Sequence, residues 1–142
     1  MTMVVGIDPD GQGRASLYLA GMLARSAGDD LVVCAVLPAA WPPSPARVDA
    51  EYRAYLERTA NTALEQARAR LPADLEAGLL VHHARSAPAG LLEVAERHDA
   101  GLIVVGSSSA GALGSVALGS VSSRLVHSSP TPVALAPRGF RC

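Results

Sequence analysis

Hydrophobic and polar positions along the chain alternate between short apolar runs and longer stretches with helical spacing. The short runs, rich in β-branched residues, predict five strands: Met3–Ile7, Leu31–Leu37, Gly78–Ala84, Gly101–Val105 and Thr131–Ala136. Apolar residues at helical spacing predict four helices: Arg14–Ala27, Ala46–Leu71, Ala87–His98 and Gly119–Ser128. Regular alternation of strands and helices predicts an α/β fold, with a parallel sheet covered by helices on both faces.

Two segments that follow predicted strands carry residues expected of a ligand site. In a parallel α/β sheet, ligands bind at the carboxyl ends of strands, where the strand order reverses. A turn beginning at Asp8 follows the first strand, and the Gly- and Ser-rich segment 106–118 follows the fourth. Two roles stay open for Asp8, because a carboxylate there either accepts hydrogen bonds from a ligand or caps amides of its own turn.

The segment after the fourth strand predicts an anion site made of main-chain N–H groups. Gly106 follows the strand directly, where the lack of a side chain lets a ligand approach the backbone. Gly119 begins the next predicted helix, so the N–H groups of Ser120, Val121 and Ser122 would point toward one place. Such amides attract phosphate. The alternative is a Gly- and Ser-rich loop that is simply solvated.

Composition and charge restrict the chemistry. The chain has 142 residues, of which 49% are hydrophobic, and a net charge of −1, which suits one domain over residues 1–142 and does not indicate nucleic-acid binding. All 12 basic residues are arginine, so the chain cannot supply the lysine of a P-loop or a Schiff base. The two cysteines do not suggest a disulfide framework, and neither a signal peptide nor a membrane span is apparent, so we expect a cytoplasmic protein.

The reactive side chains match no catalytic or metal-binding pattern. His82, His83, His98 and His127 lack metal-ligand spacing and are expected at the surface or half-buried, with the two adjacent histidines on opposite faces of their strand. Cys34 lies in an apolar run and is expected to be a small buried residue. Since paired catalytic carboxylates and a nucleophile motif are also missing, the sequence predicts a protein that is not an enzyme and holds no metal of its own.

The spacing Gly106-x2-Ser109-x9-Gly119-Ser120 resembles the nucleotide motif of the universal stress protein family, G-x2-G-x9-G-(S/T). The resemblance covers essentially the whole chain. The segments that flank the motif and agree with the family include Val5–Asp8, Val32–Pro38, Pro88–Ala95, Leu102–Ser107 and Pro130–Leu135. The glycine spacing is the specific part of the match, whereas the strands are generic.

The resemblance implies a three-layer Rossmann-like fold, similar to adenine nucleotide alpha-hydrolases, with strand order 3-2-1-4-5. It implies a homodimer formed through the edge strand Thr131–Ala136, and a bound adenine nucleotide: ATP, with Mg²⁺ where ATP is the ligand, or AMP, ADP or cyclic AMP in its place. Asp8 would hold the ribose hydroxyls, and the backbone of Val36 would meet the adenine. The phosphates would be surrounded by Gly106, Ser109, Gly119, Ser120, Val121 and Ser122.

Ser109 departs from the motif, which has glycine at that position. If the backbone there requires a positive φ, serine costs about 1 kcal/mol, which weakens affinity about fivefold without abolishing binding. Two functions therefore stay open: a nucleotide-binding regulatory or stress-response protein, and a dimeric scaffold of the same fold that binds no nucleotide. Slow ATP hydrolysis is a third, although no general base stands out.

Overall fold

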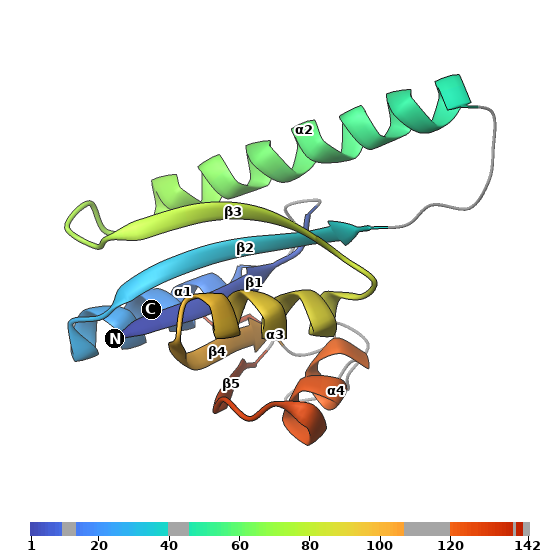
Figure 1. Cartoon of the computed structure of the whole chain (residues 1–142). Helices are drawn as coiled ribbons and strands as arrows, with labels where there is room; N and C mark the ends of the chain where they lie inside the picture. Colours follow the sequence, from blue (N-terminus) through green and yellow to red (C-terminus); the bar gives the residue numbers. More distant parts are fainter. Residues whose placement is uncertain (10–13, 40–45, 107–119, 138, 141–142) are drawn as a thin grey trace.

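The computed structural model describes residues 1–9, 14–39, 46–106, 120–137 and 139–140, and its helices and strands alternate along the chain (Figure 1). In chain order the elements are β1 (Thr2–Ile7), α1 (Ala15–Ala27), β2 (Asp30–Pro38), α2 (Ala46–Arg70), β3 (Ala77–Ala84), α3 (Ala87–Arg97), β4 (Ala100–Gly106), α4 (Ser120–Ser128) and β5 (Val133–Ala136). Each predicted element is present, and most of the ends agree to within one residue. The described helices include none that is both long enough and apolar enough to cross a bilayer.

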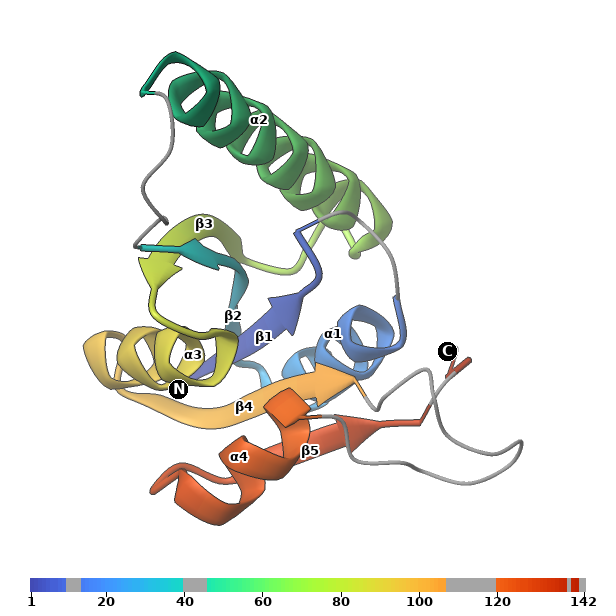
Figure 2. The ribbon, with the colours of Figure 1, turned by 90° about the vertical axis from the view of Figure 1, so that its right-hand side faces the viewer.

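The strands form one parallel sheet in the order β3-β2-β1-β4-β5, which confirms the predicted fold class and strand order. Figure 2 shows α1 and α2 on one side of this sheet and α3 and α4 on the other. A three-layer arrangement follows, because each parallel crossover returns the chain through a helix on one face.

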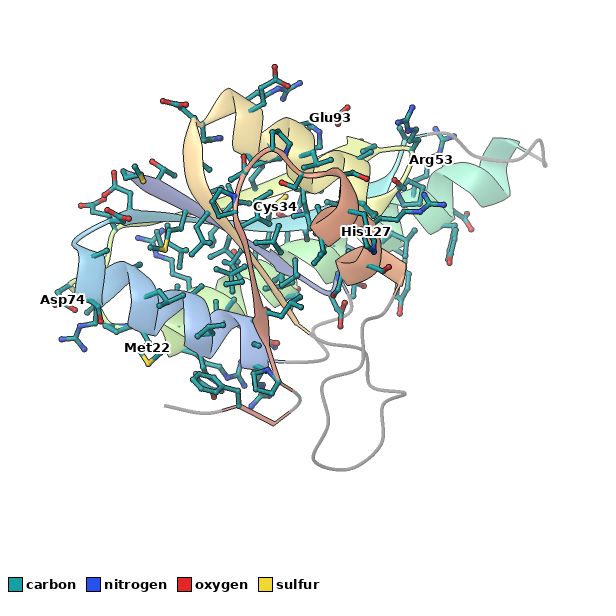
Figure 3. The ribbon with its side chains drawn as sticks, turned by 90° about the horizontal axis from the view of Figure 1, so that it is seen from below. Met22, Cys34, Arg53, Asp74, Glu93 and His127 are labelled. Atoms are coloured by element: carbon teal, nitrogen blue, oxygen red, sulfur yellow. The ribbon has the colours of Figure 1, made fainter. Side chains whose placement is uncertain are left out.

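The core consists of two apolar layers, one on each face of the sheet. Neighbouring strand residues contribute to different layers, as with Val4 and Val5 of β1, because side chains alternate across a strand. Leu64 of α2 packs in the layer with Val5, and Leu125 of α4 packs in the layer with Val4. Cys34 is fully buried in the second layer, as predicted, and lies in the interior in Figure 3.

The last strand begins later than predicted. The sequence predicts a strand from Thr131, but β5 begins at Val133. Ser129 is the reason, because its hydroxyl donates to the Thr131 carbonyl at 2.7 Å and accepts the Thr131 N–H at 3.1 Å. A local turn thus uses the polar groups that a ladder would have needed. Pro132 still contributes its carbonyl, which accepts the Ile103 N–H at 2.9 Å.

The two adjacent histidines of β3 lie on opposite faces of the sheet, as predicted, and each bonds to a glutamate of the helix that covers its face. His82 Nε2 lies 2.9 Å from Glu93 Oε2 of α3, and His83 Nε2 lies 3.2 Å from Glu57 Oε1 of α2. The expectation of surface or half-buried histidines is wrong for His82, which is buried. A hydrogen-bond partner makes its burial tolerable.

Candidate functional site

The sheet divides at its carboxyl edge between β1 and β4. The ladder between these strands runs to the pair Val5↔Val104. By contrast, β1 stays paired with β2 as far as Ile7↔Ala35, and β4 stays paired with β5 as far as Gly106↔Ala136. The ends of β1 and β4 therefore extend past their shared ladder. The chain order also reverses here, which is where ligands bind in folds of this kind.

Three predicted site residues lie at this edge. Asp8 follows the last residue of β1 and is exposed. Val36 follows Ala35, the partner of Ile7, so Val36 and Asp8 stand at the same level on neighbouring strands. Gly106 is the last residue of β4, across the division. The fold thus brings together one carboxylate, one strand backbone and one glycine from three parts of the sequence.

The beginning of α4 is attached to the end of β4. The buried Ser122 hydroxyl donates to the Gly106 carbonyl at 2.8 Å. The first N–H groups of α4, on Ser120, Val121 and Ser122, have no partner within the helix because a helix leaves its first N–H groups without one. The first turn of α4, which carries these N–H groups, therefore lies close to Gly106, where the phosphates are predicted to bind.

The structure uses the Ser122 hydroxyl within the protein itself. Since its hydrogen is donated to the Gly106 carbonyl, the side chain does not offer a donor to an anion in this arrangement, whereas the backbone N–H does. Val121 is half-buried and packs with the core layer beneath α3 and α4. Ser109 and Gly119 lie outside the described residues, as does the side chain of Ser120.

Sequence reasoning missed a matching attachment on the other side of the division. Ser16, in the first turn of α1, is buried, and its hydroxyl donates to the Gly6 carbonyl of β1 at 3.2 Å. Ser16 and Ser122 thus have the same structural role, because each side chain links the first turn of a helix to a glycine carbonyl near the end of the preceding strand. The recurrence of serine in the first turn after β1 and β4 is the sequence signal that could have revealed it.

Two hollows adjoin this edge on the face covered by α1 and α2. The smaller one holds Asp8 beside two arginines, Arg14 of the α1 N-terminus and Arg70 of α2. The larger one, of about 140 Å³, lies below α2 and is lined by Leu37, Pro38, Ala39, Arg53, Leu56, Glu57 and His83. Asp8 thus shares a hollow with two cationic side chains, and its carboxylate oxygens can accept hydrogen bonds from hydroxyl groups of a ligand.

Chemical groups for catalysis are scarce in the described part of the chain. Burial raises the pKa of the Cys34 thiol to about 12, so the sulfur stays protonated at neutral pH and is a poor nucleophile. Within the described ranges there is also no group of three or more His, Cys, Asp or Glu side chains that could hold a metal ion. The arrangement at the β1–β4 division is suited to holding a ligand by backbone and carboxylate contacts.

Known proteins are similar to this chain in sequence and in fold. The family model described as the universal stress protein family matches residues 1–137. Universal stress protein Rv2319c of Mycobacterium tuberculosis is 42% identical over 147 aligned residues, covering 100% of this chain and 50% of that protein. The chain therefore spans about half the length of this curated relative.

Solved structures of other family members show the same fold at lower identity. The universal stress protein from Archaeoglobus fulgidus in complex with dAMP has a TM-score of 0.65 at 20% identity, covering 96% of this chain and 97% of that one. A universal stress protein in complex with cAMP has a TM-score of 0.62 at 24% identity, and 98% of each chain is covered. The family model, the sequence match over the whole of this chain and the common strand order agree: this chain belongs to the universal stress protein family.

Proposed function

We propose that this chain is a regulatory protein of the universal stress type that binds an adenine nucleotide, with ATP as the expected ligand. The observation that carries the proposal is the division between β1 and β4. It has Asp8 and Val36 on one side, and Gly106 with the beginning of α4 on the other. The dAMP and cAMP complexes of its structural neighbours support the choice of an adenine nucleotide.

In the proposed complex, the ligand lies across the division. The Asp8 carboxylate accepts the ribose hydroxyls, and the Val36 backbone meets the adenine edge. The N–H groups at Ser120, Val121 and Ser122 face the phosphates, together with Gly106, Ser109 and Gly119. A helix N-terminus favours an anion both by its free N–H groups and by its dipole. Mg²⁺ would enter with the phosphates of ATP, because it is bound chiefly through the phosphate oxygens of such ligands.

Binding rather than turnover is the proposed activity. The described residues near the division provide hydrogen-bond donors, one carboxylate and arginines, but the thiol of Cys34 is fully buried. A nucleotide that is held without being consumed acts as a signal, because its occupancy follows its concentration. We place this activity in the cytoplasm, where adenine nucleotides are abundant.

The test is ligand-induced thermal stabilisation, followed by calorimetric titration. A ligand that binds only the folded state stabilises it by RT ln(1 + [L]/Kd), about 2.7 kcal/mol at 100 times Kd. We expect ATP, ADP, AMP or cAMP, each with and without Mg²⁺, to raise the melting temperature by several degrees. Unchanged melting with every nucleotide at millimolar concentration would refute the proposal and favour a dimeric scaffold that binds none.

Asp8→Asn is the matched variant, because it keeps the shape of the side chain and removes its charge. We expect it to weaken nucleotide affinity at least tenfold, the loss of about 1.4 kcal/mol of charge-assisted hydrogen bonding. Asp30→Asn is the control, since Asp30 is an exposed carboxylate at the opposite, amino end of β2. Equal affinity of both variants and the wild type would exclude the proposed ribose contact.

The proposal includes a homodimer formed through the outer edge of β5. The Pro132 carbonyl accepts from Ile103 of β4, so alternate residues, Val133 and Leu135, turn their backbone groups away from β4. The missing N–H of Pro132 therefore falls on the row facing β4, and the outward row keeps its donors. We expect light scattering to give twice the chain mass. A monomer at all concentrations would contradict this part of the proposal.

A further inference from the structure

The first half of α3 packs against the carboxyl ends of β2 and β3 at a residue that has no side chain. Gly90 is buried, and a Cβ atom built on it would lie 2.6 Å from Val36 Cγ1 and 2.8 Å from Val36 Cγ2. The same atom would lie 3.2 Å from the Cβ of Ala84, the last residue of β3. Helix and strand therefore approach each other more closely than any residue with a side chain would allow.

Rotation of the valine side chain cannot relieve this contact. A valine has two γ-methyl groups for three staggered positions, and both positions occupied now lie within 3.0 Å of the added atom. Every staggered rotamer leaves at least one methyl group in one of those two positions. Since β-branched side chains are also stiff at χ1, a methyl group at position 90 must displace backbone.

The end of β2 is tied to β3 but not to β1, because its ladder with β3 runs to Pro38↔Ala84, whereas its ladder with β1 ends at Ile7↔Ala35. Ser86 caps α3 by accepting the Ala89 N–H at 3.3 Å, and the Gly90 N–H bonds to the Ser86 carbonyl at 3.0 Å. The next residue of α3, Leu91, is buried against Gly6 of β1. A Cβ atom built on Gly6 would lie 3.0 Å from both Leu91 Cδ atoms. Moving α3 outward would open this contact, whereas a shift of Val36 relative to β1 breaks no pair of the β1–β2 ladder.

We propose that Gly90 is a positioning residue for the base-binding end of the nucleotide site: by lacking a side chain, it sets where the backbone of Val36 stands relative to β1. The proposal rests on the proposed function, in which that backbone meets the adenine. Gly90 makes no contact with the ligand itself. It acts through Val36, and only on the part of the ligand that Val36 touches.

The experiment compares the affinities of ATP and of inorganic tripolyphosphate for Gly90→Ala. Tripolyphosphate carries the phosphate chain without the base, so it reports the Gly106 and α4 side alone. We expect ATP affinity to fall about tenfold, the loss of one backbone hydrogen bond, and tripolyphosphate affinity to stay within twofold. Gly78→Ala is the control, because an added Cβ there has no neighbour within 4 Å. Its affinities should equal those of the wild type.

A second pair of variants tests whether the effect passes through Val36. In a Val36→Ala background both γ-methyl groups are absent, so Gly90→Ala no longer overlaps with residue 36, and the 3.2 Å approach to the Ala84 Cβ is the close contact that remains. The ratio of ATP to tripolyphosphate affinity should then be the same for Val36→Ala and for the double variant, within twofold. If Gly90→Ala alone does not fold and the double variant does, the overlap with Val36 is the cause; a double variant whose ratio differs from that of Val36→Ala by more than twofold overturns the inference.

The outcomes separate this inference from the proposed function. If wild-type protein binds neither ATP nor any other adenine nucleotide, the proposed function fails, and the inference fails with it. If the wild type binds ATP and Gly90→Ala binds it equally well, the inference alone is overturned. A parallel loss of ATP and tripolyphosphate affinity would also overturn it, because a purely structural defect does not distinguish the base from the phosphates.

Discussion

Ser122→Ala should destabilise the fold more than its single missing oxygen suggests. Ser122 is buried, and its hydroxyl donates to the Gly106 carbonyl at 2.8 Å. Losing a neutral hydrogen bond costs about 1 kcal/mol, and leaving the half-buried carbonyl without this donor adds about 1 kcal/mol. The sum is about 2 kcal/mol. With an unfolding entropy of about 2.1 cal/mol/K per residue, 142 residues give about 0.3 kcal/mol/K, so the melting temperature should fall by about 7 °C.

Urea denaturation followed by circular dichroism measures this change, with the slope m required to stay constant so that the shift reports stability. Ser123→Ala is the control, because Ser123 is the next residue of α4 and has no hydrogen bond of its side chain to a described residue. Its stability should stay within about 0.5 kcal/mol of the wild type. Ser16→Ala should fall between the two variants, since its bond to Gly6 is longer, at 3.2 Å. If Ser122→Ala and Ser123→Ala were equally stable, the hydroxyl would not attach α4 to β4.

Three further outcomes follow from the described residues. In a Cys142→Ser background, Cys34 should resist Ellman's reagent at pH 8 until the protein is unfolded. Burial raises its pKa from an ordinary value of 9.0 to about 12, so the stability that the neutral thiol contributes is complete below pH 9 and is lost toward pH 12, as an alkaline titration of urea midpoints would show. Gly28→Ala should cost about 1 kcal/mol in urea unfolding, because Gly28 ends α1 at φ 71°. Leu64→Ala should cost about 2–5 kcal/mol in the same assay, because this fully buried side chain of α2 leaves a cavity, and an unchanged midpoint would contradict the core assignment.

The elements of this fold could be predicted from the sequence because their signals are local. The apolar run around Val33 and the helical spacing between Leu17 and Ala24 can each be read from a short stretch of sequence. The ends of most strands and helices can therefore be predicted to within one residue. The predicted start of β5 at Thr131 is wrong for a reason that is also local but that hydrophobic patterning does not show. A single serine hydroxyl at Ser129 took both polar groups of Thr131 out of the ladder.

The site was predictable only in part, because its parts meet through tertiary structure. Glycine spacing and strand ends predict Gly106 and Asp8 as site residues, and the fold places both at the β1–β4 division. The burial of His82 was not predictable in this way, because it depends on Glu93, which lies 11 positions away. The close approach of Gly90 to Val36 depends on how α3 lies across the sheet, and no periodicity in the sequence reports that distance. The same holds for the Ser16 hydroxyl, whose partner Gly6 is 10 positions away.

The early end of the β1–β4 ladder leaves a line along which the last residues of these two strands are not paired with each other. On one side of it stand β3, β2 and β1, and on the other stand β4 and β5, joined by pairs that end at Val5↔Val104. A ligand bound across this line would contact both parts of the sheet and hold them together. Slower amide hydrogen exchange at the ends of β1 and β4 would then report its binding. The stiffness of the whole sheet would then rise and fall with the concentration of one small metabolite.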